Sequence, residues 1–99
     1  MNKSWQKLIK ALHQKKHRQD EQLFLVEGEK SVEELLNSAL LTKAVFFTKE
    51  FALKYSDLLE TKAKVVELWE TSQIILGQVG TLQSNNAALA VAQMPHNQL

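Results

Sequence analysis

Segments with helical spacing of apolar residues alternate along this chain with short apolar runs, and this alternation constrains the fold more than any other feature. Apolar residues of segment 3–17 repeat at the helical interval, which predicts an amphipathic helix there. The continuous Leu-Phe-Leu-Val run at residues 23–26 predicts a strand that is buried on both faces.

The same reasoning extends to the end of the chain. Further helices are predicted at residues 32–39, 48–59 and 71–79, and further strands at residues 44–47, 64–69 and 87–92. Strands that alternate with helices predict crossover connections, so we expect an α/β fold with a largely parallel sheet of about four strands and helices on both faces. With 99 residues, the chain has room for one domain.

Residues suited to helix ends support these boundaries. Asn2 or Ser4, Thr48 and Thr71 stand where helix N-caps are needed. Gly80 follows the last predicted helix and is suited to stopping it. Gly28 lies between a predicted strand and a predicted helix, where a residue without Cβ permits a tight turn.

The formal charge of +1 conceals a strong division along the chain. Residues 1–18 contain six basic residues and no acidic residue, whereas the remainder contains six lysines and eleven acidic residues. A basic segment of this kind attracts polyanions. Three interpretations remain open for it: a nucleic-acid surface, a plain solvated helix whose C-terminal cations favour the helix dipole, or a helix that binds a membrane or a partner.

Residues typical of catalysis or metal binding do not gather in the sequence. The chain has no cysteine, which excludes a thiolate metal site, a cysteine nucleophile and a disulfide framework. His13 and His17 would share one helix face, but their neighbours are basic, so we interpret them as solvated residues of the basic helix and expect no metal. The acidic pairs Glu33–Glu34 and Glu67–Glu70 are interpreted as solvated surface.

No segment predicts insertion into a membrane. The longest uninterrupted apolar run covers residues 87–92, far short of the roughly 20 residues needed to span a bilayer. Residues 1–20 lack the apolar stretch of a secretory signal, although a basic mitochondrial presequence remains an alternative. Together with the absence of cysteine, these features predict a cytoplasmic protein.

Two segments near the start of the chain, residues 15–18 and 22–34, resemble a known family. Lys15-Lys16-His17-Arg18, followed by the Gln22–Glu34 segment QLFLVEGEKSVEE, resembles the opening of the SpoU/TrmH-family RNA 2′-O-ribose methyltransferases. Segment 44–48 is similar to the second strand of the family and segment 88–91 to its last. The sequence departs from the family at Ser84-Asn85-Asn86-Ala87, where a Thr-Pro-Gln-Gly-like turn is usual.

The resemblance implies a three-layer α/β/α sandwich related to kink-turn-binding ribosomal proteins, with structured RNA as the partner. Those ribosomal proteins grip RNA with a Gly-x-Asn-Glu loop, and the turn at Glu27-Gly28-Glu29-Lys30 lacks that Asn, so kink-turn binding itself is not predicted. The motifs of the family's S-adenosylmethionine site are missing from these 99 residues. Residues 1–95 are therefore expected to be a non-catalytic RNA substrate-binding domain, and residues 96–99 the start of a linker.

What the resemblance implies for the whole protein lies beyond residue 99. We expect the reading frame to continue into a methyltransferase domain that binds S-adenosylmethionine, methylates rRNA or tRNA and forms a homodimer. A free-standing ribosome-associated protein and a protein-interaction module are the alternatives.

Site residues follow from the charge pattern and the resemblance together. Glu27 and Gly28 are expected to shape a turn, and Trp69 to pack in a core or interface in preference to stacking on a base. The residues expected to contact RNA phosphates are Lys7, Lys10, Lys15, Lys16, Arg18 and Lys30.

Overall fold

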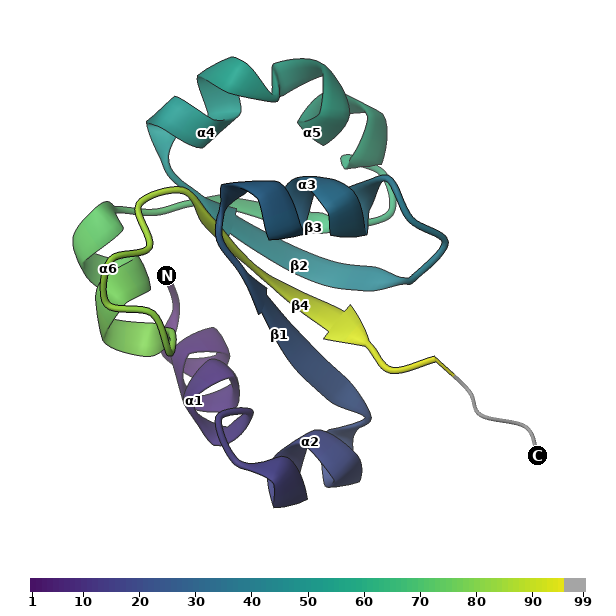
Figure 1. Ribbon diagram of the computed structural model, residues 1–99, viewed down its shortest axis with the longest axis vertical. Helices are drawn as coiled ribbons and strands as arrows, with labels where there is room; N and C mark the ends of the chain where they lie inside the picture. The colour runs from purple at the N-terminus through teal and green to yellow at the C-terminus, as the bar shows by residue number, and fades with distance from the viewer. Residues whose placement is uncertain (96–99) are drawn as a thin grey trace.

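A four-stranded mixed sheet with helices on both faces organises the protein (Figure 1). The computed structural model describes residues 1–95, so the linker expected at 96–99 lies outside the described residues. The strands are β1 (Leu23–Glu27), β2 (Thr42–Phe47), β3 (Glu67–Glu70) and β4 (Ala88–Gln93). The helices are α1 (Lys3–Ala11), α2 (Lys15–Glu21), α3 (Glu29–Leu36), α4 (Lys49–Lys54), α5 (Ser56–Lys62) and α6 (Gln73–Val79).

Two cores separated by the sheet confirm the α/β fold class. On one face, α3, α4 and α5 bury residues such as Val32, Phe51 and Leu59 against the sheet. On the other face, α1 and α6 bury residues such as Ile9 and Leu76. Helix α2 contacts β1 and lies at the end of the sheet where β1 begins (Figure 1).

The expectation of a largely parallel sheet is wrong. The order is β1-β4-β2-β3, and only β2 and β3 pair in parallel, because β4 enters antiparallel between β1 and β2. The connection 71–87 folds back at the end of the sheet where it begins, instead of crossing it. There the Thr81 N–H donates to the Glu27 carboxylate, and the Thr48 N–H donates to the Ala87 carbonyl. Strand β4 therefore starts where β1 and β2 end.

The strand that is buried on both faces is β4, and not residues 23–26 as predicted. Residues 88–92 are fully buried because β4 has a strand on each side and helices above and below. Strand β1 occupies an edge of the sheet, where only Leu23 is buried and the following residues are half-buried. An apolar run by itself does not distinguish an inner strand from an edge strand that helices partly cover.

Two predicted helices are each broken into a pair. The helix expected at 3–17 divides into α1 and α2 at residues 12–14, where the His13 ring contacts the Val79 carbonyl of α6. The helix expected at 48–59 divides into α4 and α5 at Tyr55, whose φ of −120° is not helical. Both breaks coincide with tertiary contacts that helical periodicity does not reveal.

Other boundaries shift for local reasons. Helix α3 ends at Leu36 rather than near Ala39. Asn37 directly follows its last residue, and the Asn37 side chain donates to the Glu33 carbonyl. Strand β3 begins at Glu67 rather than Lys64, because residues 63–66 form a turn after α5.

The predicted N-cap residues are confirmed at two of three helices. Asn2 accepts a hydrogen bond from Trp5 N–H, and Thr48 accepts one from Phe51 N–H, as expected. Ser72, and not Thr71, caps α6. The Thr71 N–H donates to the Phe47 carbonyl at 2.8 Å, which extends the pairing of β2 with β3 and removes Thr71 from the cap position.

The described chain ends close to where the sheet begins. The Met94 N–H donates to the Gln22 carbonyl at 2.9 Å, and the Gln93 N–H donates to the Leu41 carbonyl at 2.8 Å. Residue 22 directly follows α2, so the last described residues leave the sheet beside that helix.

Gly28 provides a test of the turn between β1 and α3. Its φ of 100° with ψ of 159° is a conformation that only glycine adopts without strain. A Cβ there would meet no atom within 4 Å, so the cost of substitution is purely conformational. We expect Gly28→Ala to lower the free energy of unfolding in urea by about 1–3 kcal/mol. Ser31→Ala, at an exposed position of α3, is the control and should change it little.

Candidate nucleic-acid interface

Helix α1 presents its lysines to solvent on the side opposite its buried residues. Lys3, Lys7 and Lys10 recur at intervals of four and three residues and are exposed. The opposite side buries Ile9 completely and brings the Trp5 ring to 5.4 Å from the Phe46 ring, centroid to centroid. Burial of one side therefore fixes which way the lysines face.

Lys15 and Lys16 lie in the first turn of α2 and are exposed. This position corrects one interpretation of the sequence, in which they were stabilised at the C-terminus of a single long helix. At a helix N-terminus the partial charge is positive, so two lysines are unfavourable there, and α2 has no acidic residue in its first turn to offset them. Helix stability does not explain these two lysines.

The corner between α1 and α2 is held by two polar side chains. Arg18 donates from Nη1 to the carbonyls of Leu12 and His13, both at 2.9 Å, which satisfies groups at the end of α1. The His13 Nε2 lies 2.8 Å from the Val79 carbonyl and so joins the corner to α6. His13 thus precedes α2 while His17 lies within it, and the shared helix face expected for them does not form. We call Lys3, Lys7, Lys10, Lys15 and Lys16 the basic surface.

Lys30 does not join the basic surface. It lies on α3, across the sheet from α1, and at the far end of β1 from α2. Its Nζ is 3.7 Å from a Glu33 carboxylate oxygen. The sequence places Lys30 twelve residues from Arg18, but a five-residue strand, about 16 Å long, runs between their helices.

Glu27 connects the end of β1 to the loop between α6 and β4. Its carboxylate accepts hydrogen bonds from the N–H groups of Thr81 and Leu82, at 2.9 and 3.2 Å, and from the Thr81 hydroxyl. Gly80 passes so close to this carboxylate that a Cβ would collide with it. These contacts hold the loop between α6 and β4 against the end of β1.

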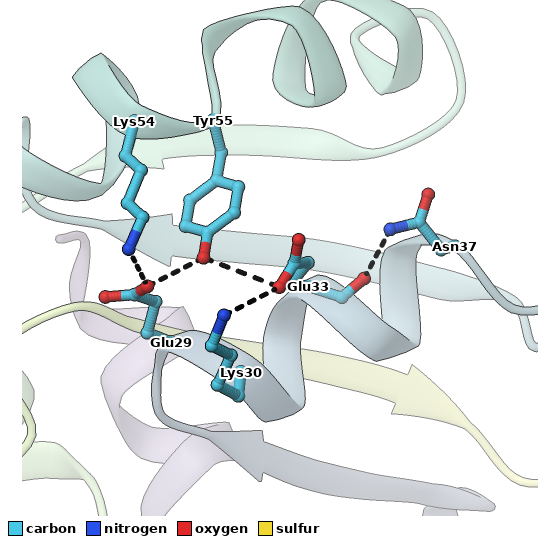
Figure 2. A network of polar contacts seen from close by, with 6 residues as sticks. All are labelled: Glu29, Lys30, Glu33, Asn37, Lys54 and Tyr55. Atoms are coloured by element: carbon cyan, nitrogen blue, oxygen red, sulfur yellow. Dashed lines mark hydrogen bonds and ion pairs between the residues drawn. The ribbon is translucent and has the colours of Figure 1, made fainter.

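A polar network that sequence patterns do not reveal joins α3 to α4 (Figure 2). The Tyr55 hydroxyl and the Lys54 ammonium each donate to Glu29 Oε2 at 2.7 Å, and the hydroxyl also approaches Glu33 at 3.4 Å. The hydrogen bond from Lys54 is the main cause of a lowered pKa at Glu29, and the same bond raises the pKa of Lys54. The bond to Glu29 also raises the pKa of Tyr55 well above its usual range.

The end of the sheet opposite α2 carries acidic and basic side chains together. Strands β1, β2 and β3 run in the same direction, so this end holds Glu29, Glu50 and Glu70, and also Lys30, Lys49 and Lys54. Because Lys54 pairs with Glu29 and Lys30 with Glu33, this end offers a phosphate fewer unpaired cations than α1 and α2 do.

The sequence and the fold are similar to those of known proteins. Residues 5–90 match the model of the MRM3-like substrate binding domain. The chain belongs to this family. No curated protein matches the sequence significantly.

Solved structures share the fold of this substrate binding domain. An AdoMet-bound rRNA methyltransferase from Sinorhizobium meliloti superposes with a TM-score of 0.79 at 18% identity, over 96% of this chain and 35% of that one. A TrmH-family protein from Porphyromonas gingivalis gives 0.77 at 22%, over 100% and 38%. The SpoU methyltransferase AviRb from Streptomyces viridochromogenes, in complex with AdoMet, gives 0.74 at 19%, over 99% and 35%. The chain thus spans little more than a third of these proteins.

None of the helices formed by residues 1–95 combines the length and apolar character that crossing a bilayer requires.

Arg18 provides a test of the corner. Arg18→Ala removes two charge-assisted hydrogen bonds to carbonyls, so we expect the free energy of unfolding in urea to fall by about 1–2 kcal/mol. Lys16→Ala removes an exposed side chain of the same helix and serves as the control. Equal stability of the two variants would contradict the capping role of Arg18.

The network of Figure 2 predicts a pH dependence of stability. The lowered pKa of Glu29 means that its contribution is present above the unfolded value of 4.5 and is lost as the pH falls through the folded value. We therefore expect Glu29→Gln to lose less stability than the wild type between about pH 5 and about pH 3. Glu34→Gln, on the exposed side of α3, should follow the wild type, and urea unfolding at each pH measures the difference.

Proposed function

We propose that this chain is the RNA-recognition part of a longer ribose 2′-O-methyltransferase. The observation that carries the proposal is the match to a methyltransferase-associated substrate binding domain across residues 5–90. The chain contributes binding, and we assign no catalytic step to residues 1–99.

The basic surface supports RNA as the substrate. Its five lysines are exposed, and the ion pairs formed within residues 1–95 involve Lys30 and Lys54 instead. Unpaired ammonium groups in water gain most from phosphates, which release condensed counterions when they are neutralised. Lys15 and Lys16 also stand at an unfavourable helix position, which a bound polyanion would compensate.

Contacts of this kind position an RNA without reading its sequence. Lysine acts on a phosphate as a point charge, so the basic surface supplies affinity and orientation. Arg18 retains nitrogens beyond the capping Nη1 and can add a contact at the same corner. Lys30 stands apart, so any phosphate contact by it would belong to a different part of the RNA.

The proposal extends to the rest of the protein. A methyl-transfer domain would follow Pro95, bind S-adenosylmethionine and methylate a ribose of rRNA or tRNA, and the protein would act as a homodimer in the cytoplasm. Two of the similar solved structures are described as AdoMet-bound methyltransferases, which supports this cofactor.

Salt dependence tests the proposed interface. We expect Lys15→Gln with Lys16→Gln to weaken binding of a structured rRNA fragment and to flatten the plot of log K against log salt by roughly 0.7–0.9 for each phosphate that is no longer neutralised. Lys49→Gln with Lys62→Gln removes the same charge from α4 and α5 and is the matched control. Filter binding at several salt concentrations measures both, and identical slopes for the two double variants would contradict the interface.

A further inference from the structure

An open hollow at the edge of the sheet is lined in part by exposed apolar side chains. Its volume of about 710 Å³ falls within the roughly 300–1,000 Å³ of small-molecule pockets. Leu41, Val65 and Trp69 line it with exposed fractions of 67%, 74% and 42%. Lys43 and Lys64 border it and are exposed as well. Apolar side chains grouped with cations are typical of a binding surface.

Trp69 lies on the same face of the sheet as the basic helix α1. It is the register partner of Phe46, and partners in a parallel pair point to the same face. Phe46 is fully buried and has the Trp5 ring of α1 packed edge-on against it. Three aromatic side chains thus follow one another from α1 to the sheet edge, and the outermost, Trp69, is the exposed one. Of the two positions expected from the sequence, a core or an interface, this exposure contradicts the core position.

A second copy of the chain is a poor occupant of this edge. Antiparallel self-pairing of β3 about its centre would set Glu67 opposite Glu70 twice, and like charges directly opposite are destabilising. A nucleic acid has no such conflict at the hollow, because Lys43 and Lys64 outnumber Glu67 among its charged residues.

We propose that Trp69 is a stacking platform for an unpaired RNA base, with Lys43 and Lys64 holding the phosphates beside it. Indole faces stack on any base, and a cationic border that follows the backbone is the usual companion of such platforms. Glu67 lies two residues from Trp69 on the same face and repels phosphate from the ring. The base therefore covers the indole while the backbone runs along the lysines.

The location suits an RNA already held by the basic surface. The hollow lies along the starts of β2 and β3, and α2 precedes the start of β1, so both lie at the same end of the sheet, at opposite edges that three interstrand spacings, roughly 14 Å, separate. The inference rests on the proposed function and deepens it, because it requires a single-stranded element in the bound RNA.

The experiment compares a labelled RNA hairpin that has an unpaired loop with the same stem closed as a blunt duplex. Fluorescence anisotropy at fixed salt should show Trp69→Leu weakening hairpin binding by roughly 5- to 100-fold and leaving duplex binding unchanged. Trp69→Phe keeps a stacking face and should restore most of the affinity. Leu53→Ala, an exposed apolar residue of α4, is the control. Circular dichroism checks that each variant is folded.

The outcomes separate this inference from the proposed function. If the wild type binds RNA with a steep salt dependence but Trp69→Leu binds the hairpin equally well, the stacking site is overturned and the proposed function stands. Equal losses in Trp69→Leu and Trp69→Phe, or equal losses for hairpin and duplex, would also overturn it. If the wild type binds neither RNA, the proposed function fails and takes this inference with it.

Discussion

The burial of β4 in the middle of the sheet is the constraint on which the rest of the structure depends. Residues 88–92, which read Ala-Leu-Ala-Val-Ala, are fully buried between two strands and two helical layers. Alternation gives each layer its own set: Ala88, Ala90 and Ala92 lie in one core, and Leu89 and Val91 in the other. The alanines let α3 and its neighbours approach closely, while the larger residues fill the space under α1 and α6.

Inserting β4 antiparallel also places the starts of β1, β2 and β3 at one end of the sheet and their ends at the other. Helix α2 stands before the start of β1, and α3 and α4 follow the ends of β1 and β2. Lysines of α2 and of the edge hollow lie at the first end, whereas at the second end Lys30 and Lys54 are paired with Glu33 and Glu29. The formal charge near zero therefore includes lysines that form no ion pair within residues 1–95 and can attract a polyanion.

The sequence predicted those features that are set by residues near each other in the chain. Helix and strand types, the caps at Asn2 and Thr48, and the glycine turn at Gly28 are all local, and each is observed. Strand order, the divided helices and the position of Lys30 depend on which segments meet in space. Nothing in the spacing around Tyr55 indicates that its hydroxyl reaches Glu29, twenty-six residues earlier. The exposure of Trp69 was likewise undecidable, because an aromatic residue at a strand end looks the same whether its strand lies inside the sheet or at its edge.

The bond from Met94 N–H to the Gln22 carbonyl joins the last described segment to the residue that follows α2. In the proposed longer protein, the following domain would be tethered at this point, at the C-terminal end of α2. The tether would start from the helix that carries Lys15 and Lys16 and not across the sheet from it. The length of the linker would then set which nucleotides of the bound RNA the methyl-transfer domain can reach.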